Sequence, residues 1–324
     1  MVKKVASLSL DLDNKWSYMK THGDVDWDSY PTYLDIVVPR VLKILEQHKF
    51  TITFFVVGQD ASREKNFKAL RSIADAGHEI GNHSFNHEPW LHLYSEEDIV
   101  KELADTEDAI EKITGKKPIG FRGPGYSLSQ TVLKVLHDRG YAYDCSTFPT
   151  FLGPLARTYY FMTTDLPEEE KKKRKQLFGT FSEGLRPLKP YKWSVNNGTI
   201  PEIPVTTMPI FKIPMHLSYI LFIANISTFL AMFYFRMALF LCKITGVQPS
   251  LLLHPLDFLE LKDAPELEFF PAIQMPLDKK LDIVNQVFKI YASQYEVVNM
   301  QEHVNRLSLD LPSVVPEFKI LEQT

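Results

Sequence analysis

The chain has few cysteines and no excess of basic residues. Its 324 residues include only two cysteines, Cys145 and Cys242, which lie far apart and form no CxxC pair. Two free thiols in a reducing compartment are the simplest interpretation, and we expect them here. The formal net charge is −4, so composition gives no electrostatic basis for binding nucleic acid.

The chain also has no recognisable secretion signal, internal repeat or extended low-complexity segment. It begins MVKKVASLSLDLD, and the apolar stretch after Lys3 and Lys4 is too short for a signal peptide. The alternation of polar and apolar residues predicts instead a strand that begins almost at once. We therefore expect a cytoplasmic protein.

Short β-rich segments alternate with segments whose apolar residues recur at helical spacing. This alternation predicts a parallel α/β architecture, and seven or eight strands favour a closed or nearly closed barrel over a doubly wound sheet. The predicted strands are 5–11, 51–58, 78–84, 118–124, 141–147, 200–207, 250–255 and 295–300. The predicted helices are 33–48, 96–114, 129–140 and 278–292.

The span 148–214 differs from this alternation. It is rich in proline and contains the charged run EEEKKKRK at 168–175. A solvated surface insertion explains such a run, and a long insertion between barrel strands is also a usual way to build a substrate lid. We expect one domain over 1–324, with an insertion at about 148–214.

The segment 217–242 is unusually apolar, with Arg236 as its only charge. It is long enough to span a bilayer. Ser227, however, has the position of an N-cap that divides the segment into two helices, and Gly246 can end the second. Three interpretations stay open: helices packed in the barrel core, a helix in contact with lipid, or a transmembrane span.

Ionisable residues follow five of the predicted strands at their C-terminal ends, where parallel barrels carry their active sites. Residues i and i+2 of a strand face the same side, so Asp11 and Asp13 can share one site. One carboxylate can then bind a metal while the other acts as a base. The other four strand ends supply His83 with His87, Arg122 with Tyr126, Asp144, and His254.

His83 and His87 are four residues apart, so one helical turn would place both imidazoles on the same side. Neutral imidazoles suit zinc and related metals, and an aspartate as third ligand leaves a position open, as in catalytic sites. The HExxH protease motif is absent, because the next histidine after Glu88 is His92, one residue too far. An isolated HxxxH pair is also typical of ordinary polar or core histidines, but combination with an Asp-x-Asp strand end predicts a metal centre.

Five motifs resemble, in order, those of the polysaccharide deacetylase family, whose members share the NodB homology domain (carbohydrate esterase family 4). Together they cover residues 5–255. Most family members have adjacent aspartates in the first motif, whereas Leu12 separates them here, as in some cytoplasmic members. The motifs are SLDLD at 9–13, HSFNH at 83–87, RGPGY at 122–126, YDCS at 143–146 and LLH at 252–254.

The resemblance implies a distorted (β/α)7–8 barrel of the NodB type and a single divalent metal ion. Asp13, His83 and His87 would hold the ion, with zinc expected first and cobalt or nickel as alternatives. Asp11 would be the general base. Arg122 would orient Asp11 through a charge-assisted hydrogen bond.

The resemblance also implies an acid and an oxyanion site. His254 would protonate the leaving amine, and Asp144 would support its charged form. The backbone N–H of Tyr126 would help to stabilise the oxyanion. Tyr126 and Trp90 are aromatic residues near the rim that either contact a sugar substrate or only pack.

The activity implied is hydrolysis of an N-acyl group, acetyl or formyl, on an amino sugar or glycan. The apolar helices and the insertion suggest a lipid-linked substrate or peripheral contact at the inner membrane face. Two alternatives remain: an allantoinase-like hydrolase of a non-carbohydrate amide, and a non-catalytic glycan-binding protein of the same fold. The second predicts loss of a metal ligand or of the acid, whereas the sequence has all of them.

Overall fold

The computed structural model describes residues 3–152, 181–195, 198–270, 272–307 and 310–318. The strands are β1 (Lys4–Leu12), β2 (Thr53–Val56), β3 (Glu79–Asn82), β4 (Gly120–Phe121), β5 (Tyr143–Asp144), β6 (Tyr191–Val195), β7 (Gly198–Glu202), β8 (Thr207–Met208), β9 (Ile213–Pro214), β10 (Ser250–Leu253), β11 (Tyr295–Val298) and β12 (Ser313–Val314). The helices are α1 (Lys15–His22), α2 (Leu34–His48), α3 (Gly58–Ser62), α4 (Glu64–Asp75), α5 (Glu96–Thr114), α6 (Gln130–Asp138), α9 (Leu217–Ile226), α10 (Thr228–Thr245), α11 (Leu277–Gln294) and α12 (Met300–Asn305).

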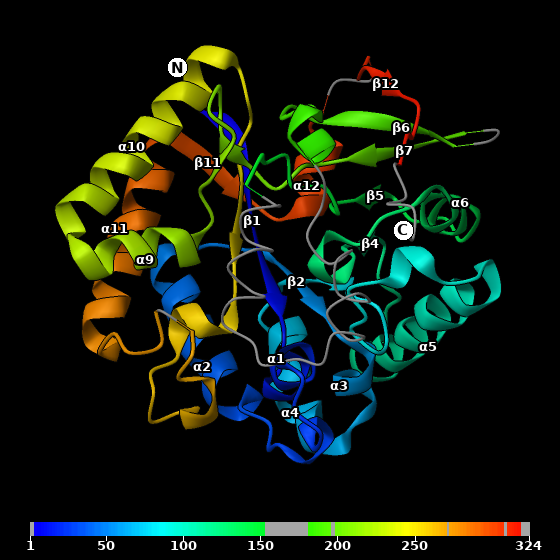
Figure 1. Cartoon of the computed structure of the whole chain (residues 1–324), viewed down its shortest axis with the longest axis horizontal. Coiled ribbons are helices and arrows are strands. Elements are labelled where there is room, and N and C mark those ends of the chain that lie inside the picture. Colours follow the sequence, from blue (N-terminus) through cyan, green and yellow to red (C-terminus); the bar gives the residue numbers. More distant parts are fainter. Residues whose placement is uncertain (1–2, 153–180, 196–197, 271, 308–309, 319–324) are drawn as a thin grey trace.

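Over the described residues the main sheet has ten strands, in the order β10-β1-β2-β3-β4-β5-β7-β6-β12, and β11 also pairs with β1. Among the strand pairs of this described part of the sheet, β6 with β7 is antiparallel and the others are parallel. Helices surround this sheet, with α9, α10 and α11 on one side of the view and α5 and α6 on the other (Figure 1). The predicted α/β fold with a mostly parallel sheet is confirmed.

Every predicted strand segment contains a strand, and the four predicted helices are present. β1 illustrates why alternating apolar and polar residues predict a strand. Leu8, Leu10 and Leu12 join the main hydrophobic cluster, while the residues between them form a second buried face that carries polar side chains. Because successive strand residues point to opposite sides, β1 separates an apolar layer from a polar interior. That polar face is Ser7, Ser9 and Asp11.

The apolar segment 217–242 forms two helices, as predicted. Ser227 ends α9, and its hydroxyl accepts a hydrogen bond from the Leu230 N–H as the N-cap of α10. Gly246 ends α10 in the left-handed conformation, with φ of 71°, which glycine adopts without a Cβ penalty.

Part of the span 148–214 extends the main sheet. β6 and β7 form an antiparallel hairpin whose β7 pairs with β5, and β8 and β9 form a separate two-stranded sheet. β6 was not among the predicted strands. The charged run at 168–175 lies outside the described residues, and its predicted role as a solvated insertion or lid stays a prediction.

A buried histidine at the contact between α12 and β1 predicts acid sensitivity. His303 is fully buried, and its ring bonds the Ser7 hydroxyl at 2.8 Å and Gln248 Oε1 at 3.2 Å. Burial lowers the pKa of His303 to about 4. The pKa of His303 is therefore lower in the folded protein than in the unfolded chain. Between pH 6.5 and 4 the unfolded chain binds more protons, so the folded state loses stability as the pH falls through this range.

We expect the free energy of unfolding to be about 2 kcal/mol lower at pH 5 than at pH 7.5 on account of His303. Urea unfolding at both pH values measures this difference. In His303→Gln the difference should shrink by about that amount. An unchanged difference in the variant would assign the acid sensitivity to other groups.

Candidate active site

Strand register brings the predicted site residues to one level of the sheet. Leu10 pairs with Leu253 on β10, so Asp11 and His254 are the next residues on adjacent strands. On the other side, Asn82 of β3 pairs with Phe121 of β4. The following residues on those two strands are His83 and Arg122. The C-terminal ends of the parallel strands therefore form a common rim, as predicted.

Asp13, His83 and His87 converge on one point. Asp13 Oδ1 lies 3.0 Å from His87 Nε2 and 3.4 Å from His83 Nε2. One ligand atom from each residue lies within 4.8 Å of the others, and all three residues are buried. Burial would raise the pKa of Asp13, but the adjacent imidazoles of His87 and His83 outweigh it and hold that pKa well below its usual range. A carboxylate that stays charged here is a suitable ligand for a divalent cation.

The loop between the two histidines has an unusual backbone that the sequence did not indicate. Ser84 and His87 have φ values of 58° and 51°, so the pair does not lie on one helical turn as predicted. Glu102 of α5 holds the loop by accepting hydrogen bonds from the Phe85 and Asn86 N–H groups at 2.8 and 2.9 Å. The apolar spacing of α5 places Glu102 on its buried face, which was the available signal for this anchor.

The donor set fits a metal ion. His83 Nδ1–H donates to the Arg122 carbonyl at 2.6 Å, so in the neutral ring the Nε2 lone pair would face Asp13 and could bind a metal. No described residue donates a hydrogen bond to Asp13 Oδ1, although this oxygen is buried. A buried carboxylate oxygen facing two imidazole nitrogens without a proton donor is costly unless a cation completes the site.

The Arg122 side chain holds the second carboxylate. Its Nη1 donates to Asp11 Oδ1 at 2.7 Å and to the Ser9 hydroxyl at 2.9 Å, and its Nε donates to the Cys145 carbonyl at 3.1 Å. The guanidinium is fully buried and lies 4.3 Å from the centre of the Phe55 ring. The predicted contact between Arg122 and Asp11 is therefore present.

Tyr126 begins a row of aromatic rings that ends at His254. Its ring stacks on Phe148 at 4.8 Å, and Phe148 lies 5.8 Å from His216. His216 is 4.5 Å from Tyr219 of α9 and 5.4 Å from His254. The backbone N–H of Tyr126 was predicted to bind the oxyanion. In the structure this N–H already donates to the Gly123 carbonyl at 2.9 Å, so it is not free for that role.

A carboxylate that sequence reasoning missed accompanies His254. Asp257 accepts from the His254 backbone N–H at 2.8 Å and from the Ser218 hydroxyl at 2.7 Å, and that hydroxyl lies 3.2 Å from His254 Nδ1. Burial raises the pKa of Asp257, and His254 opposes this rise. The spacing HPLD was the available signal, because a residue three positions after an N-cap can bond back to it.

Asp144, predicted to support His254, has other partners. It accepts from the Ser146 hydroxyl at 2.5 Å, and its register partner on β7 is Glu202. Both acids are fully buried, and burial raises the pKa of each, with the Asp144 charge raising that of Glu202 further. Two carboxyls buried together cannot both ionise cheaply. The structure thus pairs Asp144 with Glu202 and places Asp257, not Asp144, beside His254.

Asp60 is another residue that sequence reasoning missed, although it follows the C-terminal end of β2. It accepts from Asn14 at 2.7 Å, from the Trp16 indole at 3.1 Å and from Asn66 at 3.1 Å, and so anchors the segment after Asp13. Burial raises its pKa to about 6. Trp90, by contrast, is half-buried ahead of the short helix Leu91–Leu93, and its contact with substrate stays a prediction.

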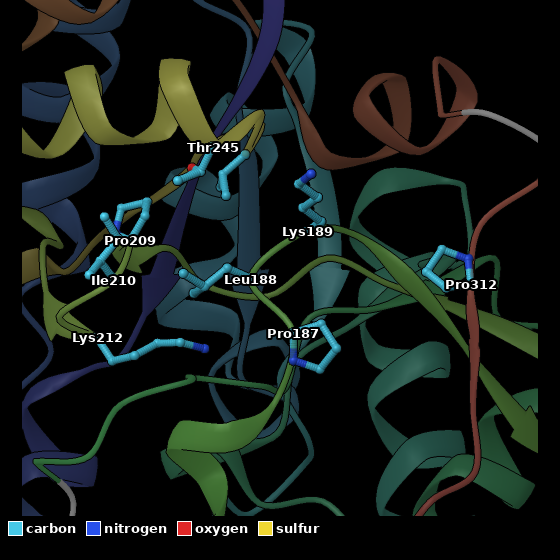
Figure 2. A pocket seen from close by; sticks show the side chains of 9 residues that line it. Pro187, Leu188, Lys189, Pro209, Ile210, Lys212, Thr245 and Pro312 are labelled. Carbon is cyan, nitrogen blue, oxygen red and sulfur yellow. The ribbon is translucent and has the colours of Figure 1, made fainter.

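A separate hollow of about 400 Å³ lies away from these groups. Figure 2 shows it between the 187–189 segment, the β8–β9 hairpin and the end of α10. Its lining is mostly apolar and includes two lysines. The lining residues are Pro187, Leu188, Lys189, Pro209, Ile210, Lys212, Thr245, Val247 and Pro312.

Residues 26–143 match the family model of the polysaccharide deacetylases. That range includes His83, His87, Arg122 and Tyr126. The chain is 32% identical over 133 residues to the peptidoglycan deacetylase of Helicobacter pylori, a match that spans 40% of this chain and 42% of that protein. It is 36% identical over 115 residues to a peptidoglycan-N-acetylglucosamine deacetylase of Bacillus cereus, spanning 34% of this chain and 48% of that protein.

The chain thus spans less than half the length of these curated relatives. The fold is also that of a crystal structure from Mycobacterium smegmatis assigned to the polysaccharide deacetylases. That likeness has a TM-score of 0.62 at 19% identity, and it covers 98% of this chain and 96% of the other. The motifs, the family match over residues 26–143 and the convergence of the motif residues at one rim thus agree in likening this chain to the polysaccharide deacetylases.

Proposed function

We propose that this protein is a metal-dependent hydrolase that removes the N-acetyl or N-formyl group from an amino sugar within a glycan. The observation that carries the proposal is the buried convergence of Asp13, His83 and His87, with a second carboxylate held separately by Arg122. A site with three protein ligands and a separate carboxylate base is an arrangement that supports metal-assisted amide hydrolysis.

When bound, a divalent ion would supply Lewis-acid activation of water and of the acyl carbonyl. The residues of the chain supply the proton transfers and the orientation. Asp11 Oδ1 is held by Arg122, so the carboxylate is positioned to take the proton of the attacking water. His254, on the adjacent strand, delivers a proton to the leaving amine. We assign Asp257 and Ser218 to the orientation of His254, in place of Asp144.

The site also supports an assignment of the substrate class. The aromatic row from Tyr126 to Tyr219 offers apolar faces to a sugar ring. The relatives named above are deacetylases of peptidoglycan and of its N-acetylglucosamine, which favours an N-acetylated glycan. A lipid-linked form of the glycan is our narrower proposal, supported by α9, which carries Ser218 and Tyr219 and leads directly into the apolar α10.

We propose zinc as the resident ion and the cytoplasm as the location. Two imidazoles with one carboxylate suit zinc, and also cobalt and nickel. The two cysteines are both buried and unpaired, which agrees with a reducing compartment.

Metal analysis combined with acyl-release assays tests the proposed function. The panel contains N-acetylglucosamine oligomers, peptidoglycan fragments, N-formylated sugars, a lipid-linked amino sugar and a purine-derived ureide. We expect acetate or formate from a sugar substrate only in the presence of zinc, cobalt or nickel. Release from the ureide alone would replace this function by the allantoinase-like alternative. Absence of both metal binding and turnover would overturn the mechanism.

A substitution of Asp257 tests its proposed positioning role. In Asp257→Asn the amide keeps only one of the two oxygens that accept from the Ser218 hydroxyl and the His254 backbone N–H, so kcat should fall about 10-fold or more. KM should stay near the wild-type value, a split between kcat and KM that a general loss of structure would not produce. Asp138→Asn, a change at an exposed helical acid, is the control and should leave both unchanged. Full kcat in Asp257→Asn would contradict the assignment.

A further inference from the structure

The helix α10 is apolar on two opposite faces. On its inner face Phe235, Ala238 and Cys242 are fully buried in the main core, and the Phe235 ring lies 6.2 Å from that of Tyr291 on α11. Among the described residues α10 is the one helix long and apolar enough to cross a membrane by length and composition, and 33% of its most apolar window is buried. Core helices of soluble proteins can be equally long and apolar. The residues on the outer face of α10 therefore decide whether this helix is only a core helix or also contacts a membrane.

The outer face is exposed and aromatic. Phe229 is 77% exposed, and Phe233 and Phe240 are each 55% exposed. At 3.6 residues per turn these residues fall on one side of α10, within about a quarter of its circumference. Neighbouring exposed residues extend the same surface along both helices. We call the following set the apolar stripe: Phe222, Ile226, Phe229, Phe233, Phe240 and Ile244.

The β8–β9 hairpin adds a second exposed apolar element. At its tip Ile210 is 66% and Phe211 is 59% exposed. Ile210 has a φ of 73°, a conformation that costs a β-branched residue energy. The tip lies close to the C-terminal end of α10, because Ile210 and Thr245 line the same hollow (Figure 2). The strained turn therefore exposes apolar side chains near the C-terminal end of α10.

The formal charges within the 203–256 span have one sign. No acidic residue occurs between Glu202 and Asp257, whereas the same span contains Lys212, Arg236 and Lys243. Arg236 and Lys243 are exposed, and helical spacing places both along one edge of the apolar stripe. The chain as a whole has more acidic than basic residues, 40 against 36, so this local excess is not a consequence of overall composition.

We infer that the apolar stripe and the Ile210–Phe211 tip together dock on an anionic lipid surface. A helix with bulky apolar residues on one side and flanking cations lies in the interfacial plane of a membrane, and each cation near an anionic surface contributes further attraction. The inner face of α10 is part of the core, so α10 would lie on the membrane and would not span it. This inference does not depend on the proposed enzymatic activity.

A second copy of this chain fits the surface less well. A two-fold interface places the same patch on both subunits. The apolar stripe would then face its copy with Arg236 and Lys243 on both sides and no acidic residue of the 203–256 span to neutralise them. An anionic bilayer supplies the missing negative charge.

Vesicle co-sedimentation of the full chain tests the inference. The vesicles are phosphatidylcholine alone or phosphatidylcholine with 30% phosphatidylglycerol, at low and high salt. We expect the wild type to pellet with the anionic vesicles, and less so at high salt. In the triple variant Phe229→Glu, Phe233→Glu, Phe240→Glu the bound fraction should fall at least 10-fold. All three positions are exposed, so the fold should be retained, and circular dichroism checks this.

The matched control replaces three exposed apolar residues elsewhere: Val25→Glu, Leu185→Glu and Val315→Glu. It should bind vesicles as the wild type does. The inference is overturned if the wild type stays in the supernatant with anionic vesicles, or if the control loses binding as much as the stripe variant. It is also overturned if sedimentation shows a dimer that only the stripe variant dissociates while neither protein binds vesicles.

Discussion

Asp11→Asn should lower kcat by about 10³-fold while the protein keeps its metal. The amide has nearly the shape of the carboxylate but cannot accept a proton, so the loss of a general base should appear in the chemical step. Asp11 is bonded by Arg122 and does not belong to the Asp13, His83 and His87 cluster. Steady-state kinetics with metal analysis of the same samples measures both effects.

Asp11→Asn also distinguishes the role of Asp11 as base from the role of Asp13 as metal ligand. If Asp11 were a ligand, Asp11→Asn would lower metal content as well as rate, and the roles of Asp11 and Asp13 would have to be exchanged. Arg122→Lys is the companion change: it keeps a positive charge but loses the Nε bond to the Cys145 carbonyl. It should lower kcat about 10-fold and leave metal content unchanged. Full activity in Asp11→Asn would reject the base assignment.

His87→Ala should weaken metal binding at least about 100-fold, since one of three protein ligands is removed. Activity at ordinary metal concentrations should then fall below detection. His87 is one of the three convergent ligands, and its Nε2 lies 3.0 Å from Asp13 Oδ1. Metal stoichiometry after dialysis, followed by titration of the metal-free protein with zinc, measures the change.

The control for this prediction is His22→Ala, because His22 lies on α1 with its ring stacked on Phe269 and takes no part in the cluster. The control should retain one ion per chain. Circular dichroism should show both variants folded. Retention of a wild-type zinc affinity by His87→Ala would remove this residue from the ligand set and leave the site with fewer protein ligands than the proposed chemistry needs.

The sequence predicted most of the elements that periodicity controls, although α4 was missed despite Phe67, Leu70 and Ile73 at helical spacing. In SLSLDLD the leucines and the polar residues alternate, and the structure places them on opposite faces of β1. The cap residues Ser227 and Gly246 were identified from local preferences alone, because capping depends on neighbouring backbone groups. α1 was not predicted: its sequence KWSYMKTH has no apolar stripe at helical spacing, and an Asn14 cap begins it.

The site contacts that were not predicted are those between residues far apart in the sequence. Asp144 ends β5, whereas Asp257 lies three residues after His254. The HPLD spacing indicates that Asp257 can cap the backbone at His254, but it does not show which acid reaches the His254 side chain. The decision depends on Ser218, which is 36 residues before His254 and bridges it to Asp257. Likewise the apolar spacing of α5 places Glu102 on a buried face, but its contact with the loop between the histidines depends on how α5 packs.

Arg122 serves the two halves of the site through different atoms. Its guanidinium holds the carboxylate of Asp11, while its carbonyl fixes the proton of His83. Substituting the side chain alters the first contact and spares the second, whereas any shift of β4 disturbs both. Attempts to engineer the metal preference are therefore better directed at the loop between the histidines. A change in that loop can alter the geometry of the metal ligands while Asp11 keeps its position.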